Sequence, residues 1–199
     1  MRPEHSTQTG AVSREAVLAA ACQLFAARGY MGTSMKNIAE QLSVRAPSLY
    51  NHVASKRDIL VTIMDRALRR ALGALEVSLE GVDDVRDQLR AATESLVLDF
   101  LRNADEVTVS NNDLRVLEGE DRVKIVAMRE EYGQRVRAII ERGHSEGTFH
   151  VSDPRVASFA ILEMGNGAKA WFRPGGVLSD VDVAQMYGDF ALRMVDSRD

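Results

Sequence analysis

The sequence predicts an all-α protein. Apolar residues recur along the chain with the i, i+3, i+4 spacing of one helical face, and no segment shows the strict alternation of a β-strand. Serine or aspartate precedes several of these stretches as a helix N-cap, and glycine ends several of them. The order of the stretches predicts a head of three short helices, a long fourth helix and a larger helical body.

The composition is that of an ordered globular chain. Hydrophobic residues make up 45% of the 199 positions, which is enough for a sizeable core. No apolar stretch reaches the ~18 residues of a membrane span, and the first residues lack the apolar segment of a signal peptide. We therefore expect a cytoplasmic protein with no membrane partner. The single cysteine excludes an internal disulfide, and histidines without i, i+4 partners predict no metal site.

The charge is divided unevenly along the chain. The net charge is −4, but residues 1–70 hold ten Lys and Arg against five Asp and Glu, and the remaining 15 basic and 24 acidic residues leave the rest at −9. A basic head that meets phosphates and an acidic body that repels DNA elsewhere would have this distribution. Charge balance also varies by chance along globular chains, so the motifs must decide.

The first predicted helices lie in the N-terminal forty residues. Residues 1–12 are polar, have no apolar period and are expected to form a flexible arm. Ser13 is the expected N-cap of a helix that Gly29 ends. A second short helix begins after Thr33 or Ser34 as its cap.

A third short helix and a long fourth helix follow. The third is expected around residues 46–52, where Pro47 falls in the first turn and removes no intrahelical hydrogen bond. Ser55 and Asp58 have capping-box spacing and open the fourth helix. This helix carries a sustained apolar stripe formed by Ile59, Leu60, Ile63, Met64, Ala67, Leu68, Ala71, Leu72, Leu75 and Leu79. Its length suffices to connect two modules.

The body continues the helical period. Apolar stripes and caps predict further helices over residues 85–101, 123–140, 154–171 and 179–195. Gly143 and Gly147 end the second of these, Asp153 and Pro154 begin the third, and Ser179 caps the last.

The head has the organisation of a helix-turn-helix, with a tight link at residues 43–46 between its second and third helices. In such a unit the second helix of the pair enters the major groove and flanking helix ends contact phosphates. The residues suited to phosphate are Thr33, Ser34 and Lys56. The third helix offers Arg45, Ser48 and Asn51 to base edges, while Tyr50 and His52 can reach phosphate or a thymine methyl. Tyr50 is alternatively a packing residue.

These residues resemble the DNA-binding domain of the TetR family. The match rests on FAARGY at 25–30, TSMKNIA at 33–39 and VRAPSLYNHVASK at 44–56. The resemblance implies phosphate contacts by Thr33, Ser34, Tyr50, His52 and Lys56, a base or phosphate contact by Lys36, and base contacts by Arg45, Ala46, Pro47 and Ser48.

Arg45 departs from that family, which usually has Ser or Thr at this position as the N-cap of the recognition helix. Arginine cannot accept the capping hydrogen bond. Either the cap is lost or the helix start shifts by one residue.

Residues 143–195 resemble one C-terminal class of the same family. The segment contains EGTFH, DPRVASFAILEMGNG, AWFRPGGVLS and YGDFALRMV. Several regulators of lipid, sterol and aromatic-acid breakdown have this class, and their effectors are often coenzyme A thioesters. The resemblance implies a helix-turn-helix domain at 13–58 and a ligand-binding and dimerisation domain at 59–199.

The effector is expected between the helices around 85–101, 120–142 and 154–171. A thioester or similar amphipathic metabolite needs an apolar pocket and a few polar or cationic groups. The apolar candidates are Phe100, Leu101, Leu117, Met128, Tyr132 and Trp171, and the polar candidates are Asn166, Lys169 and Arg173. Gly165 and Gly167 leave room for a ligand there or, alternatively, let two helices pack closely across a dimer.

The last two helices are expected to form the homodimer interface. Their apolar faces exceed what a helix pair needs to cover its own body. The candidate interface residues are Val156, Phe159, Ala160, Val183, Tyr187, Phe190 and Met194. Trp171 is alternatively part of this interface.

Together these features predict a repressor that binds a palindromic operator as a homodimer and is released by a small molecule. Two recognition helices reach successive major grooves only when they are about 34–36 Å apart, so an effector acting through the fourth helix could change DNA affinity. The alternatives are a TetR-type sensor of an unrelated drug or metabolite, or a helical enzyme or adaptor. The chain lacks a glycine-rich phosphate loop, GxSxG and HExxH, so no cofactor or catalytic site is expected, and an adaptor leaves the basic head unexplained.

Overall fold

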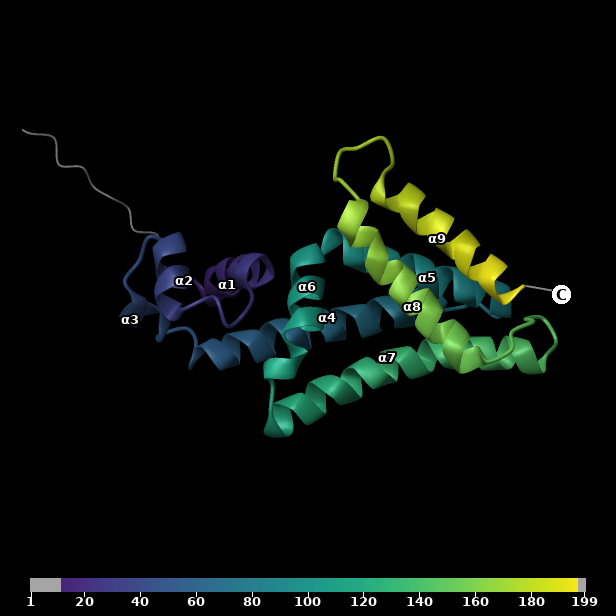
Figure 1. The fold of residues 1–199 in the computed structure, drawn as a ribbon, viewed down its shortest axis with the longest axis horizontal. Helices are drawn as coiled ribbons and strands as arrows, with labels where there is room; N and C mark the ends of the chain where they lie inside the picture. The colour runs from purple at the N-terminus through teal and green to yellow at the C-terminus, as the bar shows by residue number, and fades with distance from the viewer. Residues whose placement is uncertain (1–11, 197–199) are drawn as a thin grey trace, which may run out of the picture.

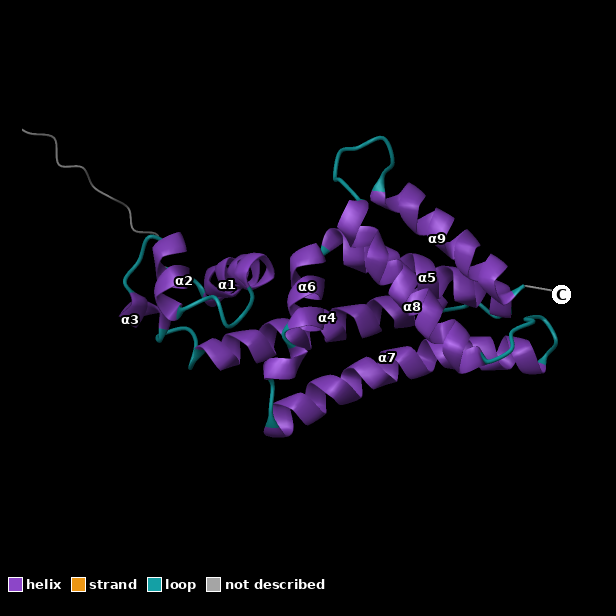
Figure 2. Cartoon of the chain, viewed as in Figure 1, coloured by secondary structure: helices purple, strands orange, loops and turns teal. Residues whose placement is uncertain are grey.

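A computed structural model describes residues 12–196, and all regular structure in this range is helical (Figure 2). The all-α class is therefore confirmed. Apart from Val12, the expected flexible arm lies outside the described residues. The head contains α1 (Arg14–Arg28), α2 (Met35–Gln41) and α3 (Ala46–Leu49). The remaining helices are α4 (Lys56–Leu79), α5 (Val85–Arg102), α6 (Ala104–Asn112), the 3₁₀ helix η1 (Leu114–Val116), α7 (Gly119–Ser145), α8 (Pro154–Trp171) and α9 (Asp180–Val195).

Most helix starts coincide with the predicted caps. The Ser13 hydroxyl accepts a hydrogen bond from the Ala16 amide, and Gly29 ends α1 with φ 74°. Of the two candidates for the start of α2, Ser34 is the cap, because its side chain accepts from the Asn37 amide. A serine or aspartate side chain likewise caps α4, α5, α8 and α9.

Three boundaries or elements differ from the prediction. The third helix ends at Leu49, with only turn-like hydrogen bonds continuing to Val53. Helix α7 runs through Gly143 to Ser145. Helix α6 was not predicted, because its sequence ADEVTVSNN is rich in polar and β-branched residues with low helix propensity. Its position depends on tertiary contacts, including the ion pair between Arg70 of α4 and Glu106.

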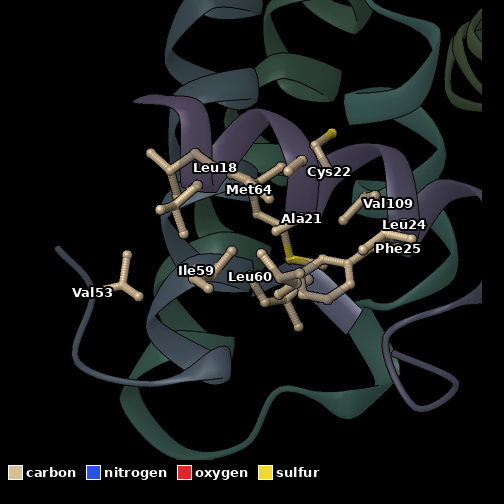
Figure 3. Packing of buried hydrophobic residues seen from close by; sticks show 14 of the residues in the cluster. Leu18, Ala21, Cys22, Leu24, Phe25, Val53, Ile59, Leu60, Met64 and Val109 are labelled. Carbon is tan, nitrogen blue, oxygen red and sulfur yellow. The ribbon is translucent and has the colours of Figure 1, made fainter. Parts of the chain in front are cut away.

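The head core extends into the body. Ile59, Leu60 and Met64 of α4 are fully buried against the apolar face of α1 (Figure 3). Residues of α2 and α3 belong to the same cluster. Val109 of α6 belongs to the same cluster, as do Leu117 and Ile125. Packing therefore does not change at residue 58, where the domain boundary was expected, but continues along the first turns of α4.

Helix α5 is central in the body. It contacts α4, α7, α8 and α9, and α9 lies along one side of it (Figure 1). Gly165 lets α8 approach closely, since a Cβ there would lie 3.0 Å from Leu96 Cδ2. Gly188 does the same for α9, where a Cβ would lie 3.0 Å from Glu94 Oε1. The close helix packing at Gly165 is therefore within one chain, whereas a Cβ at Gly167 would have no neighbour from another described element within 4 Å.

Among the described residues, none of the helices combines the length and the apolar character that crossing a membrane requires.

Candidate functional site

The outer surface of α3 presents the residues expected to meet DNA. Arg45, Pro47, Tyr50 and Asn51 are exposed, and Ala46, Ser48 and His52 are partly exposed. Leu49 is fully buried in the head core and anchors the short helix. The burial pattern thus separates one packing residue from a polar outer face. Tyr50 is 55% exposed, so it is available for a contact outside the chain.

Arg45 occupies the N-cap of α3 without a side-chain capping bond. The sequence left two alternatives, a lost cap or a helix start shifted by one residue. In the structure the helix start is not shifted and the capping bond is lost. The Ser48 hydroxyl donates back to the Arg45 carbonyl at 2.7 Å, which fixes the hydroxyl within the turn. The Arg45 side chain remains exposed.

The turn between α2 and α3 requires an unusual backbone conformation. Ser43 has φ 56°, the one left-handed non-glycine residue among residues 12–196. Around it the Val44 amide donates to the Ala39 carbonyl at 2.9 Å, which closes the turn. The geometry that orients α3 is therefore maintained by backbone hydrogen bonds at some conformational cost.

The expectation for Thr33 is wrong. Its side chain is 2% exposed, and its hydroxyl faces the carbonyl oxygens of Leu24 at 3.3 Å and Gly29 at 3.0 Å. The Gly29 carbonyl lies just past the C-terminal end of α1, where an intrahelical partner is missing, and the Leu24 carbonyl lies within the helix. Thr33 therefore closes the α1 terminus and does not offer its hydroxyl to phosphate.

Lys56 lies at the junction of the head and α4. Its Nζ donates to the carbonyl oxygens of Tyr30 at 2.8 Å and Thr33 at 2.7 Å, and it lies 4.0 Å from the centroid of the Tyr30 ring. Burial lowers the pKa of this ammonium. Because an ammonium carries three N–H donors, one remains for a phosphate.

Ser34 and Lys36 are both exposed at the start of α2. The Ser34 hydroxyl accepts from the Asn37 amide and donates to the Asn37 side-chain oxygen at 2.7 Å, so its hydrogen is already used. Lys36 has only an exposed i, i+4 pair with Glu40 at 3.7 Å. Its ammonium is therefore free to move toward DNA.

A cavity of about 610 Å³ lies within the body. This volume is in the range of small-molecule sites. Five helices, α4 to α8, provide its walls. The lining residues are Ala67, Leu68, Ala71, Leu96, Asp99, Phe100, Val107, Ser110, Asn111, Arg129, Glu130, Tyr132, Gly133, Gln134, Arg137, Arg155, Ser158, Phe159, Leu162 and Glu163.

Two of the predicted effector residues, Phe100 and Tyr132, line this cavity. Burial raises the pKa of the Tyr132 hydroxyl, which therefore stays neutral at physiological pH. Leu101 and Leu117 are wrong predictions because both are core residues. Leu101 is buried between α5, α8 and α9, and Leu117 is buried in the head core.

The other predicted effector residues also lie outside the lining. Met128 is half-buried on α7, and Lys169 is partly buried on α8. Asn166 does not line the cavity, but its side-chain oxygen accepts a hydrogen bond from the side chain of Asn111, which does. The distance is 2.9 Å. Trp171 donates to the Tyr187 hydroxyl at 3.3 Å and is half exposed, and Arg173 is exposed in the following loop. These side chains point away from the cavity because each helix is rotated about its own axis by its packing. The spacing of residues in the sequence does not define that rotation.

Sequence reasoning missed the charged lining. Arg129, Arg137 and Arg155 contribute three cations from α7 and α8. Two of them, Arg129 and Arg137, stand two helical turns apart on α7, a spacing that is also common for solvent-exposed positions. The polar side chains Ser110 and Asn111 come from the unpredicted α6, so no sequence signal pointed to them.

Helices α8 and α9 present an apolar outer face. Val156, Phe159, Ala160, Phe190 and Met194 are exposed, as predicted for interface candidates, while Tyr187 is partly buried. Val183 is a wrong prediction, because it is fully buried inside the chain. The exposed Val181 and Met186 of α9 were missed. An apolar face of this extent is typical of an association surface.

A helix-turn-helix head on a helical body with a cavity and an apolar outer face is the architecture of a DNA-binding regulator. Residues 82–195 match the tetracyclin repressor-like C-terminal domain family, and residues 17–63 match the family of bacterial regulatory proteins, tetR family. The chain belongs to the TetR family. Members of this family are transcriptional regulators that bind operator DNA as dimers and bind ligands, and they are not enzymes.

Several known proteins are similar to this chain over most of its length. It is 26% identical over 192 residues to the HTH-type transcriptional repressor KstR2 of Rhodococcus jostii, covering 93% of this chain and 92% of the relative. The crystal structure of the regulator PfmR from Thermus thermophilus is similar with a TM-score of 0.79 at 34% identity, covering 89% and 97%. The structure of AibR in complex with isovaleryl coenzyme A and operator DNA has a TM-score of 0.79 at 27% identity, covering 92% and 97%.

Proposed function

We propose that this TetR-family protein is a repressor that binds a palindromic operator as a homodimer and leaves it when an acyl coenzyme A thioester occupies the body cavity. The observation that carries the effector part is the cavity itself. It combines apolar side chains such as Leu68 and Phe100 with three arginines. Such a mixture fits a ligand with an apolar acyl part and anionic phosphates.

The proposed DNA contacts follow the exposed face of the head. Arg45 and Ser48 reach base edges, together with Ala46 and Pro47 of α3 and Asn51 of the turn that follows it. Tyr50, His52 and the remaining donor of Lys56 contact phosphates, whereas Ser34 can donate to one only when its hydroxyl leaves the Asn37 side chain. Lys36 reaches a base or a phosphate. Replacing Lys36 with Ala then either changes the preferred operator bases or weakens binding to every sequence alike, and a binding-site selection experiment separates these two roles.

The proposed dimer uses the apolar outer face of α8 and α9. Two copies of this face form a self-complementary interface of four helices, as two-fold symmetry requires. The same symmetry makes the operator palindromic, because the two heads meet equivalent half-sites. Phe159 lines the cavity and is also 56% exposed on this face, so the cavity and the interface adjoin.

A short route connects the cavity with the head. Ser110 and Asn111 of α6 line the cavity, and just beyond them the Asp113 carboxylate accepts from the Tyr30 amide at 3.3 Å. Burial raises the pKa of Asp113. Tyr30 in turn carries the carbonyl bound by Lys56. A ligand that favours a different α6 position would therefore change the orientation of the head through Asp113 as well as through α4.

Two further observations support a thioester. The similar AibR was crystallised with isovaleryl coenzyme A and operator DNA. The C-terminal segment also resembles the class described above whose effectors are often such thioesters. A second candidate function, a sensor of another drug or metabolite, is favoured by the apolar part of the same cavity, which does not by itself select a thioester.

The test is release of operator DNA measured by fluorescence anisotropy. DNA from upstream of the protein's own gene is titrated first, then challenged with acyl thioesters, the matching free acids and coenzyme A alone. Release by a thioester, but not by its separate parts, is the expected result. If no thioester releases DNA while an unrelated apolar compound does, the second candidate replaces the first. If no DNA is bound specifically, the repressor proposal fails.

A further inference from the structure

The end of the cavity next to α6 contains a cation without an anionic partner. Arg129 of α7 lines the cavity and is partly buried. Its guanidinium donates to the main-chain carbonyl of Ser110 at 3.0 Å and to the side-chain oxygen of Asn111 at 3.0 Å. Within residues 12–196, no carboxylate lies within 4.0 Å of it.

A second polar group at this end is also unsatisfied. The Ser110 side chain is 7% exposed and lines the cavity, and its Oγ is buried without a hydrogen-bond partner in the described chain. Buried polar groups normally have partners, because an unsatisfied donor costs free energy. Ser110 and Arg129 are adjacent, since the arginine bonds the serine carbonyl. Together they offer hydrogen-bond donors to one small region of the cavity.

The acidic residues of the cavity do not neutralise Arg129. The Asp99 carboxylate already accepts hydrogen bonds from the Arg70 guanidinium at 2.7 Å and from the side-chain amide of Asn103 at 3.0 Å. Glu130 and Glu163 are exposed, and solvent screens their charge. Burial lowers the pKa of Arg129, with only a partial opposing effect from Glu163. An anion bound beside the guanidinium would compensate for the cost of burying this charge without a partner.

The other two arginines of the lining lie further from α6. Arg137 lies eight residues beyond Arg129 on α7, about 12 Å along the helix, and forms a partly exposed ion pair with Glu141 at 3.2 Å. Arg155 lies at the start of α8, exposed, with its guanidinium 5.8 Å from the ring centroid of Phe159. Phe100, Leu68 and other apolar side chains lie among the same lining residues. The cavity therefore suits a ligand with an anion at the α6 end and an apolar part beside it.

We propose that the effector's acyl group ends in a carboxylate, which Arg129 and Ser110 bind at the α6 end of the cavity. The ligand class is then an ω-carboxyacyl thioester, whose coenzyme A part leaves the cavity past Arg137 and Arg155. A guanidinium binds a carboxylate with two parallel hydrogen bonds, and the serine hydroxyl adds a third donor. The coenzyme A part of this inference rests on the proposed function, whereas the carboxylate subsite does not.

The experiment compares suberoyl-CoA with octanoyl-CoA, which have the same chain length and differ in the terminal carboxylate. Binding to the full-length protein is measured by isothermal titration calorimetry, with free suberate and octanoate as further probes. We expect suberoyl-CoA to bind at least about tenfold more tightly than octanoyl-CoA, the effect of one or two charge-assisted hydrogen bonds.

Variants assign that preference to the subsite. Arg129→Met should reduce affinity for suberoyl-CoA by about tenfold or more and change octanoyl-CoA affinity by less than about threefold. Ser110→Ala leaves the backbone contacts intact and should give a smaller loss of the same selectivity, so the test does not depend on the folding of one variant. Arg135→Met is the matched control, because Arg135 is on the same helix, pairs with Glu131 at 2.7 Å and does not line the cavity.

The results separate the two proposals. Equal affinity for the two thioesters, or an equal loss of both in Arg129→Met, overturns the carboxylate subsite. If neither thioester binds but free suberate binds and depends on Arg129, the subsite is supported and the coenzyme A part of the proposed function fails.

Discussion

Replacing Lys56 with Met should destabilise the head, in addition to removing a DNA contact. The methionine retains the length of the side chain but lacks the ammonium that bonds the carbonyls of Tyr30 and Thr33 and lies over the Tyr30 ring. These contacts fix the turn that joins α1 to α2. The structure therefore gives Lys56 a folding role that its position near DNA did not indicate.

The magnitude follows from the contacts. Hydrogen bonds from a charged donor contribute about 1.5–3 kcal/mol each, and a cation–π contact contributes about 0.5–1 kcal/mol. Burial of the ammonium, which lowers the pKa of Lys56, offsets part of this, and water can partly satisfy the freed carbonyls. We expect a net loss of about 2–3 kcal/mol in the free energy of unfolding.

Urea unfolding followed by circular dichroism measures this loss, at one protein concentration because a dimer's stability depends on it. The control is Lys36→Met, whose side chain is 81% exposed and should change stability by less than about 0.5 kcal/mol. Both variants should weaken DNA binding, and Lys56→Met should flatten the log-salt slope of the dimer by about two units, about one for each head. An unfolding free energy within about 0.5 kcal/mol of the parent would show that the Lys56 contacts do not stabilise the turn.

Three further outcomes can be measured on the same protein. Gly143→Ala should cost about 1–3 kcal/mol in urea unfolding, because its Cβ would lie 2.1 Å from the Phe149 ring, whereas Gly133→Ala, with its nearest contact at 3.9 Å, should be neutral or stabilising. Phe190→Asp places a charge on the apolar α8 and α9 face and should produce monomers in size-exclusion chromatography with light scattering; a retained dimer would locate the interface elsewhere. Burial raises the pKa of the Cys22 thiol to about 12, so at pH 8 it should react with a disulfide reagent on the order of a hundredfold more slowly than in urea, and similar rates would contradict its burial.

The sequence by itself determined the elements and the class of the protein. Helix caps such as Ser13 and Ser55 are local, because their side chains bond amides only a few residues away. The apolar period and the tight link at residues 43–46 are also local features, and they predicted the helix-turn-helix. Residue motifs then identified the TetR family, which the comparisons confirm.

Tertiary packing decided which side chains face a ligand, a partner or the core. Thr33 and Val183 have the same local patterns as exposed residues, but the α1 terminus buries one and the contact of α9 with α5 buries the other. The unpredicted α6 brings Ser110 to Arg129, which lies 19 residues further along the chain on α7. Helical period fixes a face only relative to its own helix, and the rotation of each helix against its neighbours is set by packing over the whole body. The chemistry of the cavity was therefore decided by the fold.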